Sequence, residues 1–92
     1  MDEAAGNRRV YWHSRRGMLE LDLVLMPFAE QVYPGLDAAM QRRYRALLEC
    51  EDADLFAWIV HRGEPDDPEL KIIIARVLGN GMPRPELPPG AV

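Results

Sequence analysis

Apolar residues recur at the three- and four-residue spacing of one helix face in four segments of the chain, at about 18–33, 38–49, 53–62 and 68–78. A fifth segment, at about 8–16, is a shorter helix candidate. Its aromatic residues must dock on the rest of the chain, because so short a helix is not stable alone. The first of the four segments is apolar on most of its circumference and is predicted to be the central helix. The connections are short, so successive helices should pack as neighbours in a compact, all-α bundle of five helices.

Start and stop signals bound these predicted helices. Asp37, Asp52 and Asp67 are expected to be N-caps, because a short carboxylate side chain can accept from the free N–H groups of a first turn. Pro68 follows Asp67 at the first helical position, where its fixed φ suits a helix. Gly63 is expected to stop the helix that Asp52 caps.

Proline marks the two other breaks. Pro27 lies inside the central helix and should kink it or split it into two pieces, because proline lacks the N–H that a helix interior needs. Pro34 and Gly35 should end that helix.

The two ends of the chain differ from its centre. Residues 1–7 are small and polar, and residues 81–92 are rich in proline, so both ends are predicted to be flexible. Residues 8–80 remain as one folded domain. A 92-residue chain of this kind leaves little room for an enclosed pocket for a large substrate.

The apolar stripes of the helices define an expected core. In chain order its residues are Leu21, Val24, Leu25, Phe28, Val32, Met40, Tyr44, Leu47, Leu48, Leu55, Phe56, Ile59, Val60, Leu70, Ile73, Ile74, Val77 and Leu78. A neighbouring face of the central helix carries Leu19, Leu23 and Met26. Core packing is also the default for most of the aromatic residues that stand among apolar neighbours, which are Tyr11, Trp12, Phe56 and Trp58.

Composition and charge narrow the class of protein. Hydrophobic residues make up 48% of the chain and charged residues 28%, as in a folded globular protein. The net charge of −4 argues against a nucleic-acid-binding protein, which usually has a basic face. No apolar run approaches the ~20 residues of a membrane span, and the first residues resemble no targeting peptide. We therefore expect a bacterial cytoplasmic protein that does not insert into a membrane.

The sequence contains no constellation typical of an enzyme. His13 and His61 are far apart and the single cysteine, Cys50, has no CxxC partner, so we expect no metal site. Cys50 lies at a predicted helix end, and nucleophilic catalysis would need a base and an orienting group beside it. Neither GxGxxG nor GxxxxGK[ST] occurs, so a nucleotide-binding βαβ unit is not indicated.

The densest polar pattern is the stretch Arg-Arg-Gly-Met-Leu-Glu-Leu-Asp at residues 15–22. Arg16 and Glu20 are four residues apart and could form an exposed ion pair, but such a pair contributes only ~0.3–0.5 kcal/mol. The alternative is a flat recognition patch, in which Gly17 lets another surface come close while Arg16 and Glu20 hydrogen-bond across the interface. The residue types alone leave both interpretations open.

Residues 16–20, Arg-Gly-Met-Leu-Glu, resemble the RGxxE motif of the SdhE family of succinate dehydrogenase assembly factors, also called flavinylation factors. Five letters alone are a weak signal, but further family features follow in family order and cover about residues 8–78. These are Trp12, the arginine pair, Glu20-Leu21-Asp22, Met26-Pro27-Phe28, Leu47-Leu48-Glu49-Cys50 and Asp54-Leu55-Phe56-x-Trp58. The ordered set is a specific signal.

The resemblance implies a five-helix bundle that helps the flavoprotein subunit of succinate dehydrogenase, and of fumarate reductase, to acquire covalent FAD. A histidine of the flavoprotein becomes bonded to the isoalloxazine ring in that reaction. The motif maps onto Arg16, Gly17 and Glu20, and Arg15 and Asp22 are plausible helpers, so these five residues are the predicted partner-binding site. FAD is then the cofactor of the partner. We expect this chain to bind no cofactor stably, to be a monomer and not to be an enzyme.

Three other functions stay open on the sequence. An FAD carrier could hold a pyrophosphate with Arg15 and Arg16, although no phosphate-cradling glycine loop is present. An antitoxin-like regulatory module, a role assigned to some members of the family, would instead bind a membrane or cytoskeletal protein. DNA binding by a helical bundle is the least favoured, because the chain is acidic.

Overall fold

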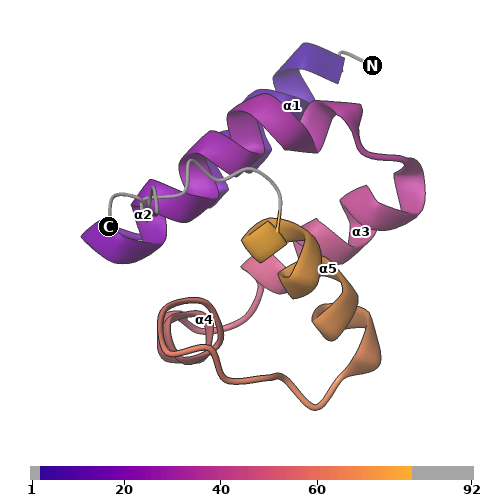
Figure 1. Cartoon of the computed structure of the whole chain (residues 1–92). Helices are drawn as coiled ribbons and strands as arrows, with labels where there is room; N and C mark the ends of the chain where they lie inside the picture. Colours follow the sequence, from indigo (N-terminus) through magenta and orange to yellow (C-terminus); the bar gives the residue numbers. More distant parts are fainter. Residues whose placement is uncertain (1–2, 80–92) are drawn as a thin grey trace, which may run out of the picture.

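The computed structural model describes residues 3–79 of the chain; residues 1–2 and 80–92, which include the predicted proline-rich tail, lie outside this range. The elements are α1 (Glu3–His13), α2 (Leu19–Pro27), the π-helical turn η1 (Phe28–Val32), the 3-10 turn η2 (Tyr33–Gly35), α3 (Ala38–Leu48), α4 (Asp52–Leu55), the π-helical turn η3 (Phe56–Val60) and α5 (Pro68–Gly79). Five α-helices, with no strand among residues 3–79, confirm the predicted all-α bundle (Figure 1).

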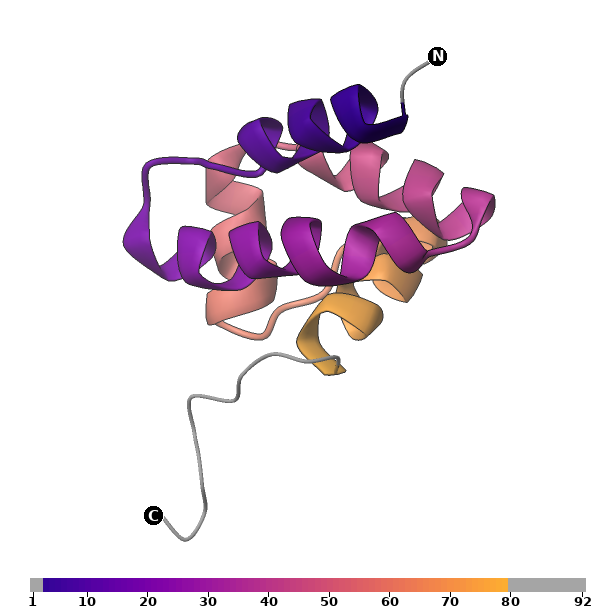
Figure 2. The same ribbon diagram turned by 90° about the horizontal axis from the view of Figure 1, so that it is seen from above.

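The first two helices form an antiparallel pair at one side of the bundle. Figure 2 shows α1 and α2 side by side and running in opposite directions, joined at one end by the corner at residues 14–18. α1 packs on η1, α2 packs on η3, and α5 packs on both α3 and η3. The side chain of Arg43 on α3 also pairs with Glu69 on α5, with Nε and Oε1 2.6 Å apart. Because the corner joins α1 and α2, and both helices contact later parts of the chain, the corner belongs to the same packed unit.

Tyr44 of α3 lies at the centre of the core. Its ring centroid is 5.1 Å from that of Phe28 and 5.5 Å from that of Tyr33. Its hydroxyl oxygen lies 2.7 Å from the hydroxyl of buried Ser14 and 3.3 Å from the carbonyl oxygen of Leu25. Tyr44 thus connects α3 to α2 and to the residue that follows α1.

The expected core is confirmed in most positions. The buried members of the expected set are Leu21, Leu25, Phe28, Tyr44, Leu47, Leu48, Leu55, Ile59, Ile73, Ile74 and Val77. The others pack partly buried around them, as do Tyr11 and Trp58. Trp12 is different, since its side chain is exposed, and the prediction that it docks on the bundle is wrong. Ser14 was not predicted to lie in the core, yet it is fully buried. Its burial is tolerated because its hydroxyl group is hydrogen-bonded.

α1 is longer and begins earlier than expected. It starts at Glu3 instead of Arg8, so residues 3–7, which we expected to be flexible, are helical. It ends at His13, three residues before the predicted end at Arg16. The earlier end leaves Arg16 outside any helix.

Pro27 changes the central helix without splitting it. The chain remains helical through Pro27, which has a φ of −63°, and continues into η1 (Figure 2). Proline has no N–H to donate, but the next residue, Phe28, already donates its backbone N–H to the carbonyls of Val24 and Leu25. A bond to a residue five positions back comes later, where the backbone N–H of Tyr33 bonds to the carbonyl of Phe28. Gly35 ends the helical path as predicted, and Leu36 is already extended.

Two of the three predicted caps are confirmed. Asp37 accepts the backbone N–H of Met40 at 2.8 Å, and Asp67 accepts that of Glu69 at 2.9 Å, with Pro68 at the first position of α5. Both contacts are made within three residues along the chain, which is why a local pattern sufficed to predict them.

The predicted boundaries of the fourth helix need correction. Glu51 occupies the N-cap position without a side-chain cap, and Asp52 is the first residue of α4. At the other end the residue with positive φ is Arg62, at 62°, and not Gly63. Gly63 donates its N–H to the carbonyl of Ala57 at 2.8 Å, and a Cβ there would lie 3.2 Å from that oxygen. A side chain at this position would therefore make an unusually tight contact with the backbone.

We expect Tyr44→Phe to destabilise the fold by about 1–2 kcal/mol, because it removes a buried hydroxyl that bonds to Ser14 and to the carbonyl of Leu25. Burial raises the pKa of Tyr44 above its ordinary value, with the Ser14 hydrogen bond acting in the opposite direction. In the unfolded chain this group ionises near pH 10, so its stabilising contribution is present below about pH 10 and is lost as the pH rises further.

Urea unfolding of both forms between about pH 8 and pH 11 tests this. The wild-type chain should lose more stability than Tyr44→Phe at the alkaline end. Tyr11→Phe is the matched control, because Tyr11 is only partly buried, and it should follow the wild-type curve. Parallel alkaline losses for wild type and Tyr44→Phe would contradict the assignment.

Candidate functional site

The predicted site residues surround a corner of the backbone between α1 and α2. Gly17 has a φ of +80°, in the left-handed region that favours glycine. A Cβ built at this position would meet no atom within 4 Å, so the backbone conformation, and not crowding, requires glycine. Gly17 is exposed, which leaves the backbone of the corner open to another surface.

Asp22 holds the corner from within α2. Its Oδ1 accepts the backbone N–H of Arg16 at 2.7 Å, and its Oδ2 accepts that of Gly17 at 3.2 Å. Met18 in the N-cap position supplies no side-chain cap to α2. Asp22 lies in the first turn of α2, where a carboxylate also complements the helix dipole. Its contacts fix the turn that precedes the helix.

The side chain of Arg16 points into the bundle. Its Nη2 donates to the carbonyl of Leu48 at the end of α3, and its Nη1 lies 3.5 Å from Oδ1 of Asp52 at the start of α4. Only 13% of the side chain is exposed. A cation near the last carbonyls of a helix is favourable, because those carbonyls have no partner within the helix. Arg16 thus ties the corner to the junction of α3 and α4.

The exposed Arg16–Glu20 ion pair that the spacing allowed is not formed. Arg16 precedes α2 instead of lying on it, and its charge is directed toward Asp52. Glu20 is exposed and has no hydrogen bond or ion pair within residues 3–79. The carboxylate of Glu20 is therefore available to another molecule.

The five predicted residues divide into two groups. Arg15, Gly17 and Glu20 are exposed around the corner. Arg16 and Asp22 are engaged within the protein and hold that corner in place. Two partners of Arg16 were not predicted from the sequence, the carbonyl of Leu48 and the carboxylate of Asp52. No sequence signal identifies a backbone carbonyl as a partner, and Asp52 carried only the signal of a helix cap.

Cys50 lies near the same junction but has no sign of activation. Burial raises the pKa of the Cys50 thiol, Asp54 raises it further, and Arg16 acts in the opposite direction. The thiol therefore stays protonated near neutral pH. No group of three or more His, Cys, Asp and Glu residues that could hold a metal ion occurs among residues 3–79.

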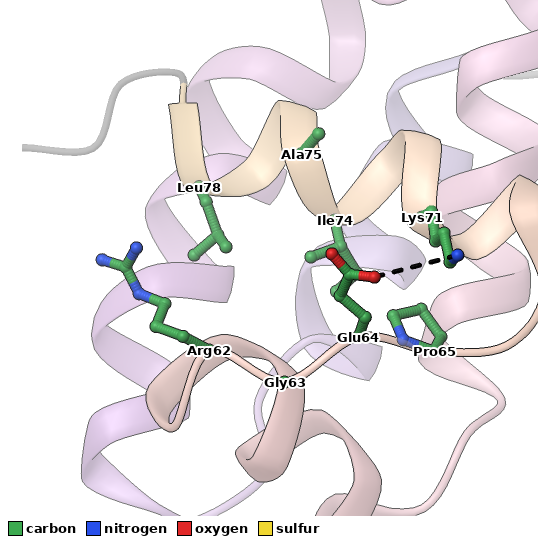
Figure 3. Close-up of a pocket in the computed structure, with 8 residues that line it drawn as sticks. All are labelled: Arg62, Gly63, Glu64, Pro65, Lys71, Ile74, Ala75 and Leu78. Carbon is green, nitrogen blue, oxygen red and sulfur yellow. Dashed lines mark ion pairs between the residues drawn. The ribbon is translucent and has the colours of Figure 1, made fainter.

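Two surface grooves lie elsewhere on the bundle. One, of about 280 Å³, is formed by α5 and the segment after η3, and the Glu64–Lys71 ion pair, 3.8 Å long, spans it (Figure 3). The other, of about 400 Å³, lies between α1 and the η1–η2 region. None of the five predicted site residues lines either groove. The predicted site is therefore separate from both of these grooves.

Known protein families include one that covers most of this chain. The family described as "Flavinator of succinate dehydrogenase" matches residues 8–80. The chain belongs to this family.

Individual members of the flavinator family are similar over most of their length. The FAD assembly factor SdhE of Pseudomonas aeruginosa is 57% identical over 76 residues, which cover 83% of this chain and 90% of that protein. The FAD assembly factor SdhE of Pseudomonas putida is 45% identical over 84 residues, covering 91% and 100%. That of Yersinia pestis is 46% identical over 68 residues, covering 74% and 77%. The family predicted from the ordered motifs is confirmed.

The flavinator-family chain shows no helix among residues 3–79 that is both long and apolar enough to cross a membrane. The assignment of Arg15, Arg16, Gly17, Glu20 and Asp22 to partner binding stays a prediction.

We expect Arg16→Lys to lower the free energy of unfolding by about 1–3 kcal/mol. A lysine ammonium keeps the charge but lacks the planar fork that reaches the Leu48 carbonyl and the Asp52 carboxylate at the same time. Urea unfolding measures the loss. Arg15→Lys is the matched control, because Arg15 is exposed, and it should change stability by less than about 0.5 kcal/mol. Equal effects of the two substitutions would show that Arg16 does not hold the corner.

Proposed function

We propose that this chain is an assembly factor that binds the flavoprotein subunit of succinate dehydrogenase and promotes covalent attachment of FAD to it. The family description names succinate dehydrogenase as the protein that its members flavinate, and relatives up to 57% identical are named FAD assembly factors. The flavoprotein of fumarate reductase is a second partner of the same kind. We place the reaction in the bacterial cytoplasm, with the chain acting as a monomer.

The proposal rests on the conformation and the exposure of the corner between α1 and α2. Gly17 is exposed in a left-handed conformation, and Glu20 beside it has no partner of its own within residues 3–79. Arg16 and Asp22 hold both residues on a rigid base. A surface that is ordered before binding loses less entropy when it binds, so more of its contact energy appears as affinity.

The chain contributes binding energy, and the flavoprotein contributes the chemistry. The five predicted site residues include no serine, cysteine, lysine or histidine, and they line neither of the two grooves described above. A partner shifts a conformational equilibrium only by the difference between its affinities for the two states. The chain therefore acts by binding more tightly to the flavoprotein conformation in which FAD and its histidine are aligned. In the complex Glu20 accepts hydrogen bonds from the flavoprotein, and Gly17 allows the two backbones to approach.

Glu20→Ala should abolish most of the effect of the chain on flavinylation. The test is co-expression with the flavoprotein subunit, scored by in-gel fluorescence of covalent flavin. Glu30→Ala is the matched control, because Glu30 is also exposed and lies on η1, ten residues after Glu20. We expect covalent flavin to fall at least tenfold with Glu20→Ala, as for loss of an interface hot spot, and to be unchanged with Glu30→Ala.

Gly17→Leu gives an independent arm of the same experiment. A side chain at positive φ costs about 1–2 kcal/mol, so circular dichroism must first show that the variant is folded. A folded Gly17→Leu variant should then fail to support flavinylation. Normal covalent flavin with both folded variants would show that the corner is not the docking site. Equal covalent flavin with and without the wild-type chain would refute the assembly role itself.

A further inference from the structure

The outward face of α2 carries a second apolar stripe that the fold does not use. Leu19 is 69% exposed and Leu23 is 62% exposed, although the bundle buries leucines at most other positions of its helices. The two residues are four apart, so they are neighbours on one face of the helix. Met26 and Pro27, both partly buried, extend this face by one more turn. We call Leu19 and Leu23 the leucine ridge.

The leucine ridge is continuous with the corner. Leu19 is the first residue of α2 and stands two positions after Gly17. Glu20 lies next to Leu19 in sequence and three residues before Leu23, so its carboxylate is at the side of the ridge. An apolar centre with polar groups around it is the usual composition of a protein–protein interface. The ridge and Glu20 therefore form one surface.

The charge on this surface argues against a second copy of the chain as its occupant. The ridge is only about one helical turn long, so a two-fold pairing of two ridges would bring the two Glu20 carboxylates close together. Arg16 could not neutralise these carboxylates, because it is directed toward Asp52, and only Arg15 of the corner is exposed to do so. The net charge of −4 on each copy adds to the repulsion.

We propose that the leucine ridge is the apolar anchor of the complex, and that it seats in a hydrophobic groove of the flavoprotein whose rim supplies hydrogen-bond donors to Glu20. This inference rests on the proposed function, because it names the part of the surface that supplies the affinity. A fully desolvated pair of leucines contributes affinity without orientation, and the charge-assisted bonds of Glu20 supply orientation. The leucine ridge thus determines the affinity of the complex, and Glu20 determines the orientation of the flavoprotein.

The test measures the dissociation constant between the purified chain and the purified flavoprotein subunit for Leu19→Ser, Leu23→Ser, Leu23→Met and Ile72→Ser. Both serine variants should bind at least tenfold more weakly than wild type, since they remove apolar area from the centre of the interface. Leu23→Met keeps the apolar surface and should bind within about threefold of wild type. Ile72 is the matched control, because it is an exposed apolar residue of α5, at 42%, and Ile72→Ser should bind as wild type does.

The serine substitutions lie on the exposed face, so unfolding in urea should be unchanged and a loss of affinity can be assigned to the interface. Leu19→Ser and Leu23→Ser could instead bind with wild-type affinity while the wild-type chain still promotes flavinylation. That result would refute the role of the ridge as anchor and leave the proposed function intact. An equal loss with Ile72→Ser would also refute it, because the effect would not belong to this face.

A wild-type chain that is dimeric by light scattering and becomes monomeric with Leu23→Ser would identify a second copy as the occupant. If the wild-type chain neither binds the flavoprotein nor raises its covalent flavin, the proposed function and the ridge both fail.

Discussion

The corner between the first two helices depends on the side chain of Arg16. That side chain reaches from the corner to the carbonyl of Leu48 and the carboxylate of Asp52, where one helix ends and the next begins. Its Nε is buried without a partner among the described residues, so the burial of this cation is only partly compensated. A buried charge is often less stabilising than an apolar side chain of similar size. The arrangement instead fixes the position of the corner, because Arg16 anchors it to the α3–α4 junction and the N–H groups of Arg16 and Gly17 donate to Asp22.

A fixed corner has direct consequences at the surface. Gly17 keeps its left-handed backbone exposed, and Glu20 keeps a carboxylate that no group within residues 3–79 engages. The leucine ridge continues the same surface along α2. The residues of the predicted site thus have different roles, since Arg16 and Asp22 hold the corner on which Gly17 and Glu20 are exposed. A binding protein made in this way can favour one state of a larger enzyme and leave the bond-forming chemistry to it.

The sequence predicted what is decided locally. The all-α bundle and the Asp37 and Asp67 caps follow from residues within a few positions of one another. Asp52 carried the same local signal as the other two caps, yet its carboxylate contacts Arg16, a residue far away in sequence. The motif indicated Arg16, Gly17 and Glu20, and their position in the sequence added Arg15 and Asp22. Which of these five residues face inward is decided by the packing of α3 and α4. The exposure of Trp12 does have a local signal, because the positions three and four residues away from it, 8, 9, 15 and 16, are all arginine.

The central claim is that the corner and the outer face of α2 are the surface that contacts the flavoprotein. Amide hydrogen exchange followed by mass spectrometry, on the free chain and on its complex with the flavoprotein subunit, tests it most directly. The account predicts that exchange in the complex slows at residues 15–23 and is unchanged at residues 62–78, which include the groove of Figure 3. Slower exchange at residues 62–78 with no change at residues 15–23 would contradict it.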